Sequence, residues 1–151
     1  MPALSQNLTF RITNGNTTTN TVSVNYPTNT ATTALIYLSE RIKGNGYFGN
    51  SDGLHTVFWS VSAFIGTIEI QGTLASAPTE TDWVTVKLTQ PGNQFYIDTS
   101  GLVTAAGIDS TRYTLVTTTS KSYNFTGNFV WIRGRISEFT QGVMSGISIN
   151  R

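Results

Sequence analysis

The stretch that decides the fold is VFWSVSAFIGTIEIQGTLASAPTETDWVTVKL, residues 57–88. Polar and apolar residues alternate along residues 67–71, so Ile68 and Ile70 share one face of a β-strand and their polar neighbours share the other. Residues 83–88 alternate in the same way. The stretch therefore predicts two strands followed by a third, with turns at Gly66 and at Ser76-Ala77-Pro78.

Trp83 stands at the start of the third predicted strand. We expect its side chain to be largely buried, as an anchor for a strand that directs Val84, Val86 and Leu88 to one face. None of these strands carries a residue pattern typical of catalysis.

The composition indicates an all-β protein. Of the 151 residues only 11% are charged, against roughly 25% in average globular proteins, and 26 are threonine. Threonine favours strands, whereas asparagine and glycine favour turns. We therefore predict one antiparallel β-sandwich domain over residues 1–151, with a jelly-roll topology. For residues 1–50 an extended N-terminal arm followed by the first strands is one open arrangement.

The charge and the lack of cysteine narrow the classes of partner. A formal net charge of +1 provides no long-range field to attract nucleic acid or an anionic membrane. No apolar run approaches the length of a membrane span, and the first six residues lack the basic and apolar regions of a secretory signal. Without cysteine there is neither a disulfide nor a thiolate metal site, and we expect no cofactor.

Short alternating segments continue on both sides of the deciding stretch. Leu8, Phe10 and Ile12 are expected to share one face, and Val22 and Val24 to point inward. The remaining expected elements are a strand or brief helix over 34–38, a surface loop over 43–53, a turn at 90–93, a short helix or loop over 102–108, and strands over 112–118, 120–125, 129–136 and 142–149.

Few residues are candidates for chemistry. His55 is the only histidine, and we expect it at the surface or at a sheet edge. Glu80 and Asp82 lie two residues apart, but Ca²⁺ takes about six to eight oxygen ligands and no Asp-rich loop supplies them. There is no Ser-His-Asp ordering, nucleophile elbow or zinc pattern. The sequence therefore predicts neither an enzyme nor a metal site.

The most informative surface lies in the segment FVWIRGRI, residues 129–136. Alternation sends Val130, Ile132 and Ile136 to the core, and the other face receives aromatic and arginine side chains, which are enriched in binding hot spots. Either this face is a protein interface or a neighbouring loop of the same chain covers it. The residues of this predicted interface row are Phe129, Trp131, Arg133 and Arg135.

Part of the chain resembles the galactose-binding or discoidin-like group of jelly-roll sandwiches. The phrases are TIEIQGTL at 67–74, followed by DWVTV at 82–86, and FVWIR at 129–133. This is a likeness of fold, and the ligand loops of that group are too variable to map onto this chain.

A second set of phrases resembles small structural proteins of tailed bacteriophages, particularly myovirus-type phages of marine cyanobacteria. The phrases are GTIEIQGTLA at 66–75, PTETDW at 78–83 and NFTGNFVWIR at 124–133, with a Gly-rich last strand. The resemblance covers residues 57–151 and transfers no functional site.

The phage resemblance implies a virion protein that acts by assembly. It would associate with copies of itself and with other virion proteins in a head decoration, neck, tail or baseplate. The low net charge and the predicted interface row favour a trimer or higher oligomer. The alternative function is a carbohydrate-binding module that presents an aromatic platform to a host-cell glycan.

Overall fold

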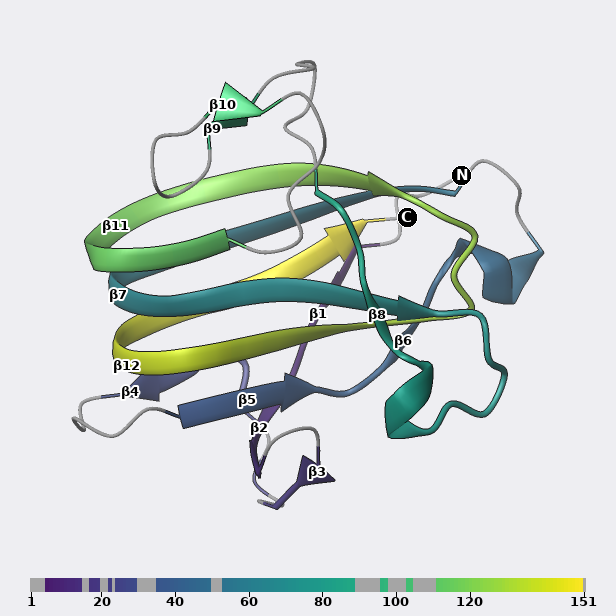
Figure 1. Cartoon of the computed structure of the whole chain (residues 1–151), viewed down its shortest axis with the longest axis horizontal. Coiled ribbons are helices and arrows are strands. Elements are labelled where there is room, and N and C mark those ends of the chain that lie inside the picture. The colour runs from purple at the N-terminus through teal and green to yellow at the C-terminus, as the bar shows by residue number, and fades with distance from the viewer. Residues whose placement is uncertain are drawn as a thin grey trace.

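The computed structural model describes residues 5–14, 17–19, 22, 24–29, 35–49, 53–88, 96–97, 103–104 and 111–150. Within these residues every strand pairing is antiparallel, and the two helices are single 3₁₀ turns (Figure 1). The elements are β1 (Ser5–Asn7), β2 (Phe10–Asn14), β3 (Thr17–Thr18), β4 (Thr28–Asn29), β5 (Leu35–Ser39), β6 (Ile42–Lys43), η1 (Asn45–Phe48), β7 (Leu54–Thr73), η2 (Glu80–Asp82), β8 (Val84–Thr85), β9 (Tyr96–Ile97), β10 (Val103–Thr104), β11 (Thr111–Thr126) and β12 (Trp131–Asn150).

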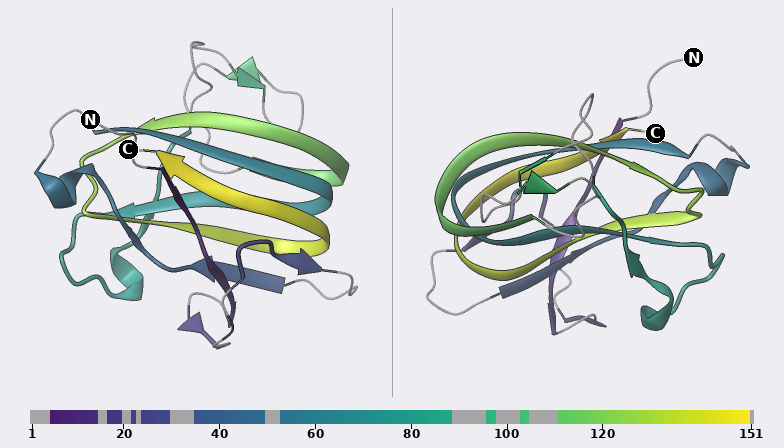
Figure 2. Two further views of the ribbon diagram at one scale, coloured as in Figure 1. Left: turned by 180° about the vertical axis from the view of Figure 1, so that it is seen from behind. Right: turned by 45° about the horizontal axis from the view of Figure 1, so that its top comes forward.

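Three long strands, in the order β11-β7-β12, form the body of the molecule. They curve round together at one end and return, so one sheet folds over into the two layers of a sandwich (Figures 1 and 2). The Leu54 half of β7 pairs with the C-terminal halves of β11 and β12, and its Thr73 half pairs with their N-terminal halves. Both ends of β7 therefore lie at the same end of the sandwich.

The long strands correct the sequence prediction, which placed breaks at Gly66, near Thr119 and over residues 138–141. The structure is continuous at all three places. The register shifts between Tyr113 and Thr119 in β11 and between Ser137 and Ile147 in β12. These shifts are bulges, and a bulge bends a strand without ending it.

The bulge in β7 explains why the pattern looked like two strands. Trp59 and Val61 face the core at odd positions, whereas Ile68 and Ile70 face it at even positions. Between them Ala63 has a positive φ of 49°, and this irregular residue allows the inward face to change parity. In a sequence, such a change cannot be distinguished from the end of one strand and the start of another.

The N-terminal residues join the same sheet. β5 pairs with β12, β2 pairs with β5, and Leu8 and Phe10 lie in the core, with Ile12 packed against it. Residues 35–39 form a strand, which settles the choice between strand and brief helix. The all-β, sandwich-like class is thus confirmed, and the jelly-roll topology stays a prediction.

The core lies between the two layers and is rich in aromatic residues. Trp59 is fully buried, with its ring centroid 5.1 Å from that of Tyr123, and the rings of Phe64 and Phe139 are 4.9 Å apart. The other side chains that are almost completely buried include Phe10, Phe125, Leu8, Ile68, Ile70, Leu88, Ile132, Ile136 and Met144.

Two inward-facing predictions are wrong. Val22 is 64% exposed and is not itself part of a strand, and Val84 is 56% exposed. β8 ends at Thr85, so the alternation that should have carried Val84 inward with Val86 and Leu88 does not extend through the segment. The turn predicted at 90–93 and most of the segment 102–108 lie outside the described residues.

Candidate functional site

The start of β12 positions three members of the predicted interface row. Ile132 and Ile136 are fully buried in the core, so the alternation confirms that Trp131, Arg133 and Arg135 face the other side of the strand. On that side the neighbouring strand β7 places Thr73, Gln71 and Glu69 directly opposite them, in that order.

This cross-strand arrangement engages both arginines. Arg133 Nε donates a hydrogen bond to Gln71 Oε1 at 2.7 Å, and Arg135 Nη1 lies 3.3 Å from Glu69 Oε1. Gln71 Nε2 in turn donates to Glu69 Oε1 at 3.2 Å. The four side chains form one polar network along two strands, and such networks hold their members in a fixed geometry.

A loop of the same chain covers part of the row. This is the alternative to a protein interface that the sequence left open for this face. Only 4% of the Arg133 side chain is exposed, because Glu80 accepts a hydrogen bond from its Nη1 at 3.1 Å and its guanidinium lies 4.2 Å from the ring centroid of Trp83. Burial lowers the pKa of Arg133 from its ordinary value, and Glu80 partly offsets this. Arg133 is therefore not an outward contact residue of the free chain.

Trp83 is not the core anchor that the sequence predicted. It is partly exposed, because it follows η2 in the surface loop and stacks on Arg133 instead of entering the core. The indole of Trp131 is also held by this loop, since its Nε1 donates to the carbonyl oxygen of Ser76 at 2.9 Å.

The other side of Trp131 opens onto an aromatic and cationic cluster. The ring of Tyr47, from η1, lies 5.0 Å from that of Trp131, and Phe48 packs edge-on against Tyr47. Arg41 lies over Trp131 at 4.4 Å and Lys43 over Tyr47 at 4.5 Å, distances typical of cation–π contacts. Tyr47 and Phe48 are 45% and 47% exposed, so they face outward rather than being tucked back.

Phe129 closes the end of the sandwich next to this cluster. Its ring lies over Gly72, where an added Cβ would come within 2.6 Å of the ring, and it packs against the core. On the β8 side it lines a groove of about 350 Å³ together with Leu74, which is 71% exposed, and Val84. This end of the molecule therefore presents apolar and aromatic side chains to solvent.

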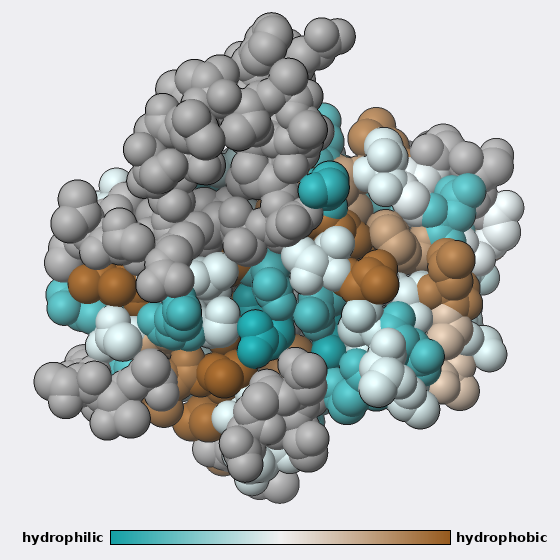
Figure 3. Space-filling view, viewed as in Figure 1, coloured by the Kyte–Doolittle hydropathy of each residue, from teal (hydrophilic) through white to brown (hydrophobic). Residues whose placement is uncertain are grey.

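We call this region the end surface. Figure 3 shows apolar residues interspersed with polar ones on the right, at the end where β7, β8 and η1 lie. The end surface consists of Tyr47, Phe48, Leu74, Val84 and Trp131.

Sequence reasoning found only part of the end surface. It identified Trp131, and it placed Tyr47 and Phe48 in a surface loop, but it missed Leu74 and directed Val84 inward. It also missed Arg41 and Lys43, whose cations lie over the rings of Trp131 and Tyr47. Arg41 and Lys43 flank the buried Ile42, so period-two alternation around Ile42 was a usable signal. Leu74 carried no signal, because its exposure follows from the end of β7.

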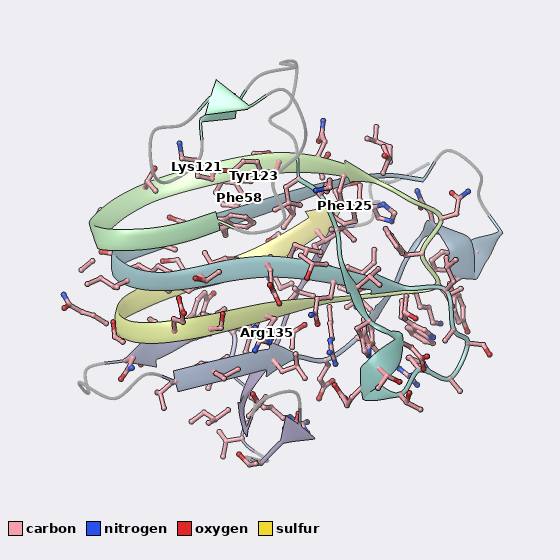
Figure 4. The ribbon with its side chains drawn as sticks, viewed as in Figure 1. Phe58, Lys121, Tyr123, Phe125 and Arg135 are labelled. Carbon is pink, nitrogen blue, oxygen red and sulfur yellow. The ribbon has the colours of Figure 1, made fainter. Side chains whose placement is uncertain are left out.

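His55 is not at the surface, contrary to the sequence prediction. It is completely buried, because its position in β7 faces the interior of the sandwich. Its ring stacks on that of Phe125, which Figure 4 labels, with the ring centroids 4.7 Å apart. Its Nδ1 lies 2.8 Å from the carbonyl oxygen of Gly53, and the backbone N–H of Asn45 donates to its Nε2. This arrangement requires the neutral Nδ1–H tautomer, which ties η1 to β7.

Glu80 and Asp82 have structural partners. Glu80 pairs with Arg133, and Asp82 accepts hydrogen bonds from the backbone N–H and the hydroxyl of Thr79 at 2.6 and 2.9 Å. These bonds hold the pKa of Asp82 below its ordinary value. Over the described part of the chain, no three His, Asp or Glu side chains are grouped to hold a metal ion, and no helix is long and apolar enough to cross a membrane.

No protein-family model matches the chain, and no curated protein matches it either.

Proposed function

We propose that the chain is a non-catalytic structural protein of a tailed-phage virion that assembles through its end surface with copies of itself and with other virion proteins. The observation that carries the proposal is the exposure of Leu74 and Val84, at 71% and 56%, at the same end of the sandwich as the exposed rings of Tyr47 and Phe48. Large exposed apolar side chains that gather at one place are typical of protein-binding surfaces.

The composition supports assembly as the mode of action. A net charge of +1 gives little repulsion between copies. The cluster around Trp131 also contains tyrosine and arginine, the residue types that dominate binding hot spots. The phage setting rests on the resemblance of residues 57–151 to small phage structural proteins, and the trimer or higher oligomer is part of the same proposal.

Paired substitutions on the end surface test the proposal. Leu74→Asp combined with Val84→Asp introduces two charges at exposed positions and should reduce the mass measured by light scattering to that of the monomer. The thermal melting temperature should change little, because neither side chain is in the core. Val22→Asp is the matched control, since Val22 is 64% exposed and is not part of the end surface. A double variant that keeps the oligomeric mass of the wild type would rule out this surface.

A second candidate function is carbohydrate binding, as the sequence alternative proposed. The rings of Trp131 and Tyr47 with Arg41 and Lys43 above them favour it, because aromatic faces and cations together suit acidic glycans. A glycan array distinguishes the two functions, because carbohydrate binding requires that the chain retain a glycan and assembly does not.

A further inference from the structure

Arg133 is a buried guanidinium with one nitrogen left over. Its Nε and Nη1 are bonded to Gln71 and Glu80, but its Nη2 is buried and meets no hydrogen-bond acceptor in the part of the chain that the structure describes. Buried polar atoms are nearly always hydrogen-bonded, so an unmatched arginine nitrogen marks a position where a water, an ion or a ligand is expected. Burial also lowers the pKa of this arginine, and an added anion would offset that effect.

Arg133 lines a hollow of about 200 Å³. The hollow lies between β5 and the loop that carries η2. The hollow provides hydrogen-bonding groups of three kinds: two guanidinium groups, two hydroxyls and one carboxylate, with an indole ring beside them. We call it the arginine hollow, and its polar and aromatic residues are Thr18, Ser39, Arg41, Glu80, Trp83 and Arg133.

The charge in the arginine hollow is positive. Arg41 and Arg133 carry two positive charges and Glu80 carries one negative charge, which leaves an excess of one. Arg41 is exposed and, among the described residues, has no carboxylate partner; its guanidinium lies over Trp131. Glu80 already accepts from Arg133. An anionic group is therefore the complement of this site.

We propose that the arginine hollow binds a small carboxylate ligand of the size of one hexuronic acid. Guanidinium groups bind carboxylates with charge-assisted hydrogen bonds, and here Arg41 and Nη2 of Arg133 are the donors. The hydroxyl of Thr18 and, once it has turned away from Arg133, the carboxylate of Glu80 match hydroxyl groups of a sugar ring. The hollow is smaller than the roughly 300–1,000 Å³ of drug-sized sites, so it accommodates one sugar unit. This inference goes beyond the assembly function and does not depend on it.

Nη2 of Arg133 is closed to solvent in the free chain, so the ligand reaches it only when a covering side chain moves. The side chain of Glu80 is 48% exposed and is the group able to rotate away. The ligand carboxylate then replaces that of Glu80 beside Arg133, and the ring of Trp83 senses the exchange because it stacks on Arg133.

Titration with sodium glucuronate, followed by tryptophan fluorescence and calorimetry, tests the proposal. Glucose is the neutral control of the same size, and acetate supplies the carboxylate without the ring. Arg41→Gln should weaken glucuronate binding about tenfold or more, the usual effect of losing a charged hydrogen bond. Lys121→Gln is the control for loss of a cation, because Lys121 is exposed on β11 and does not line the hollow. Figure 4 shows Lys121 well apart from Arg135, which lies on the same face of β12 as Arg133.

The proposal is supported if glucuronate binds, if Arg41→Gln weakens it and if Lys121→Gln does not. It is overturned if glucuronate does not bind, if glucose or acetate binds as tightly, or if the two variants behave alike. The oligomeric mass of the wild type, measured on the same sample with and without glucuronate, should stay the same, so a failure here is separate from a failure of the assembly function.

Discussion

Gly142→Ala tests whether one sheet folds over into both layers. Gly142 lies where β12 curves, with a φ of 98°. An added Cβ would meet the carbonyl oxygen of Ala63 and lie 2.6 Å from Cα of Phe64, both in the backbone of β7. A backbone cannot move aside as a flexible side chain does, so the two strands must separate at the bulge.

The expected cost follows from two effects. A residue other than glycine at this φ costs about 1–3 kcal/mol, and overpacking against fixed atoms costs about 1–3 kcal/mol more. The free energy of unfolding should therefore fall by about 2–6 kcal/mol, which corresponds to a drop of about 4–24 °C in Tm for a chain of this length.

Gly49→Ala is the matched control. Gly49 also has a positive φ, of 72°, but nothing lies within 4 Å of an added Cβ, so this variant carries the backbone strain without the collision. Urea unfolding and thermal melts of both variants provide the comparison. If Gly142→Ala is no less stable than Gly49→Ala, the close approach of β12 to the bulge in β7 is wrong.

Three further expectations concern the core, the acid response and metals. Trp59→Ala should cost about 3–5 kcal/mol and Trp83→Ala clearly less in urea unfolding, because Trp59 is fully buried and Trp83 is partly exposed; equal losses would refute this. The pKa of Asp82 is lowered in the folded chain, so its contribution to stability is present above its unfolded pKa of about 4 and is lost as the pH falls further. The difference in Tm between the wild type and Asp82→Asn should accordingly be present at pH 7 and disappear below about pH 4. A difference that stays constant over this pH range would contradict the prediction. EDTA should leave the Tm unchanged, because Glu80 and Asp82 are engaged by Arg133 and Thr79; a fall in Tm would indicate a calcium site.

Periodicity was sufficient to predict the all-β class and part of the core. The alternation around Ile68 and Ile70, and that of Leu8 and Phe10, placed these side chains correctly, because the period of a strand is a local property. The same local reasoning broke β7 into two strands. Whether a change of parity at Ala63 is a bulge or a turn depends on the neighbouring strands, which the local sequence does not encode.

The candidate site was predictable only where alternation decided it. The pattern placed Arg133 on the outer side of β12, but its burial depends on Glu80 and Trp83, some fifty residues away in the sequence. The prediction for His55 was wrong for a similar reason, because the ring that it stacks on in the core belongs to Phe125 on another strand. Long-range packing of this kind has no signal in a single sequence.

The most direct test of the central proposal is to measure the copy number of this chain in tailed-phage particles by quantitative mass spectrometry. The particles are purified from cells in which the chain is produced. A structural protein that assembles through its end surface should be present in a fixed ratio to the other virion proteins, at three copies or a higher number set by the symmetry of its ring. Absence from the particles, or a ratio that varies from one preparation to the next, would contradict the structural function.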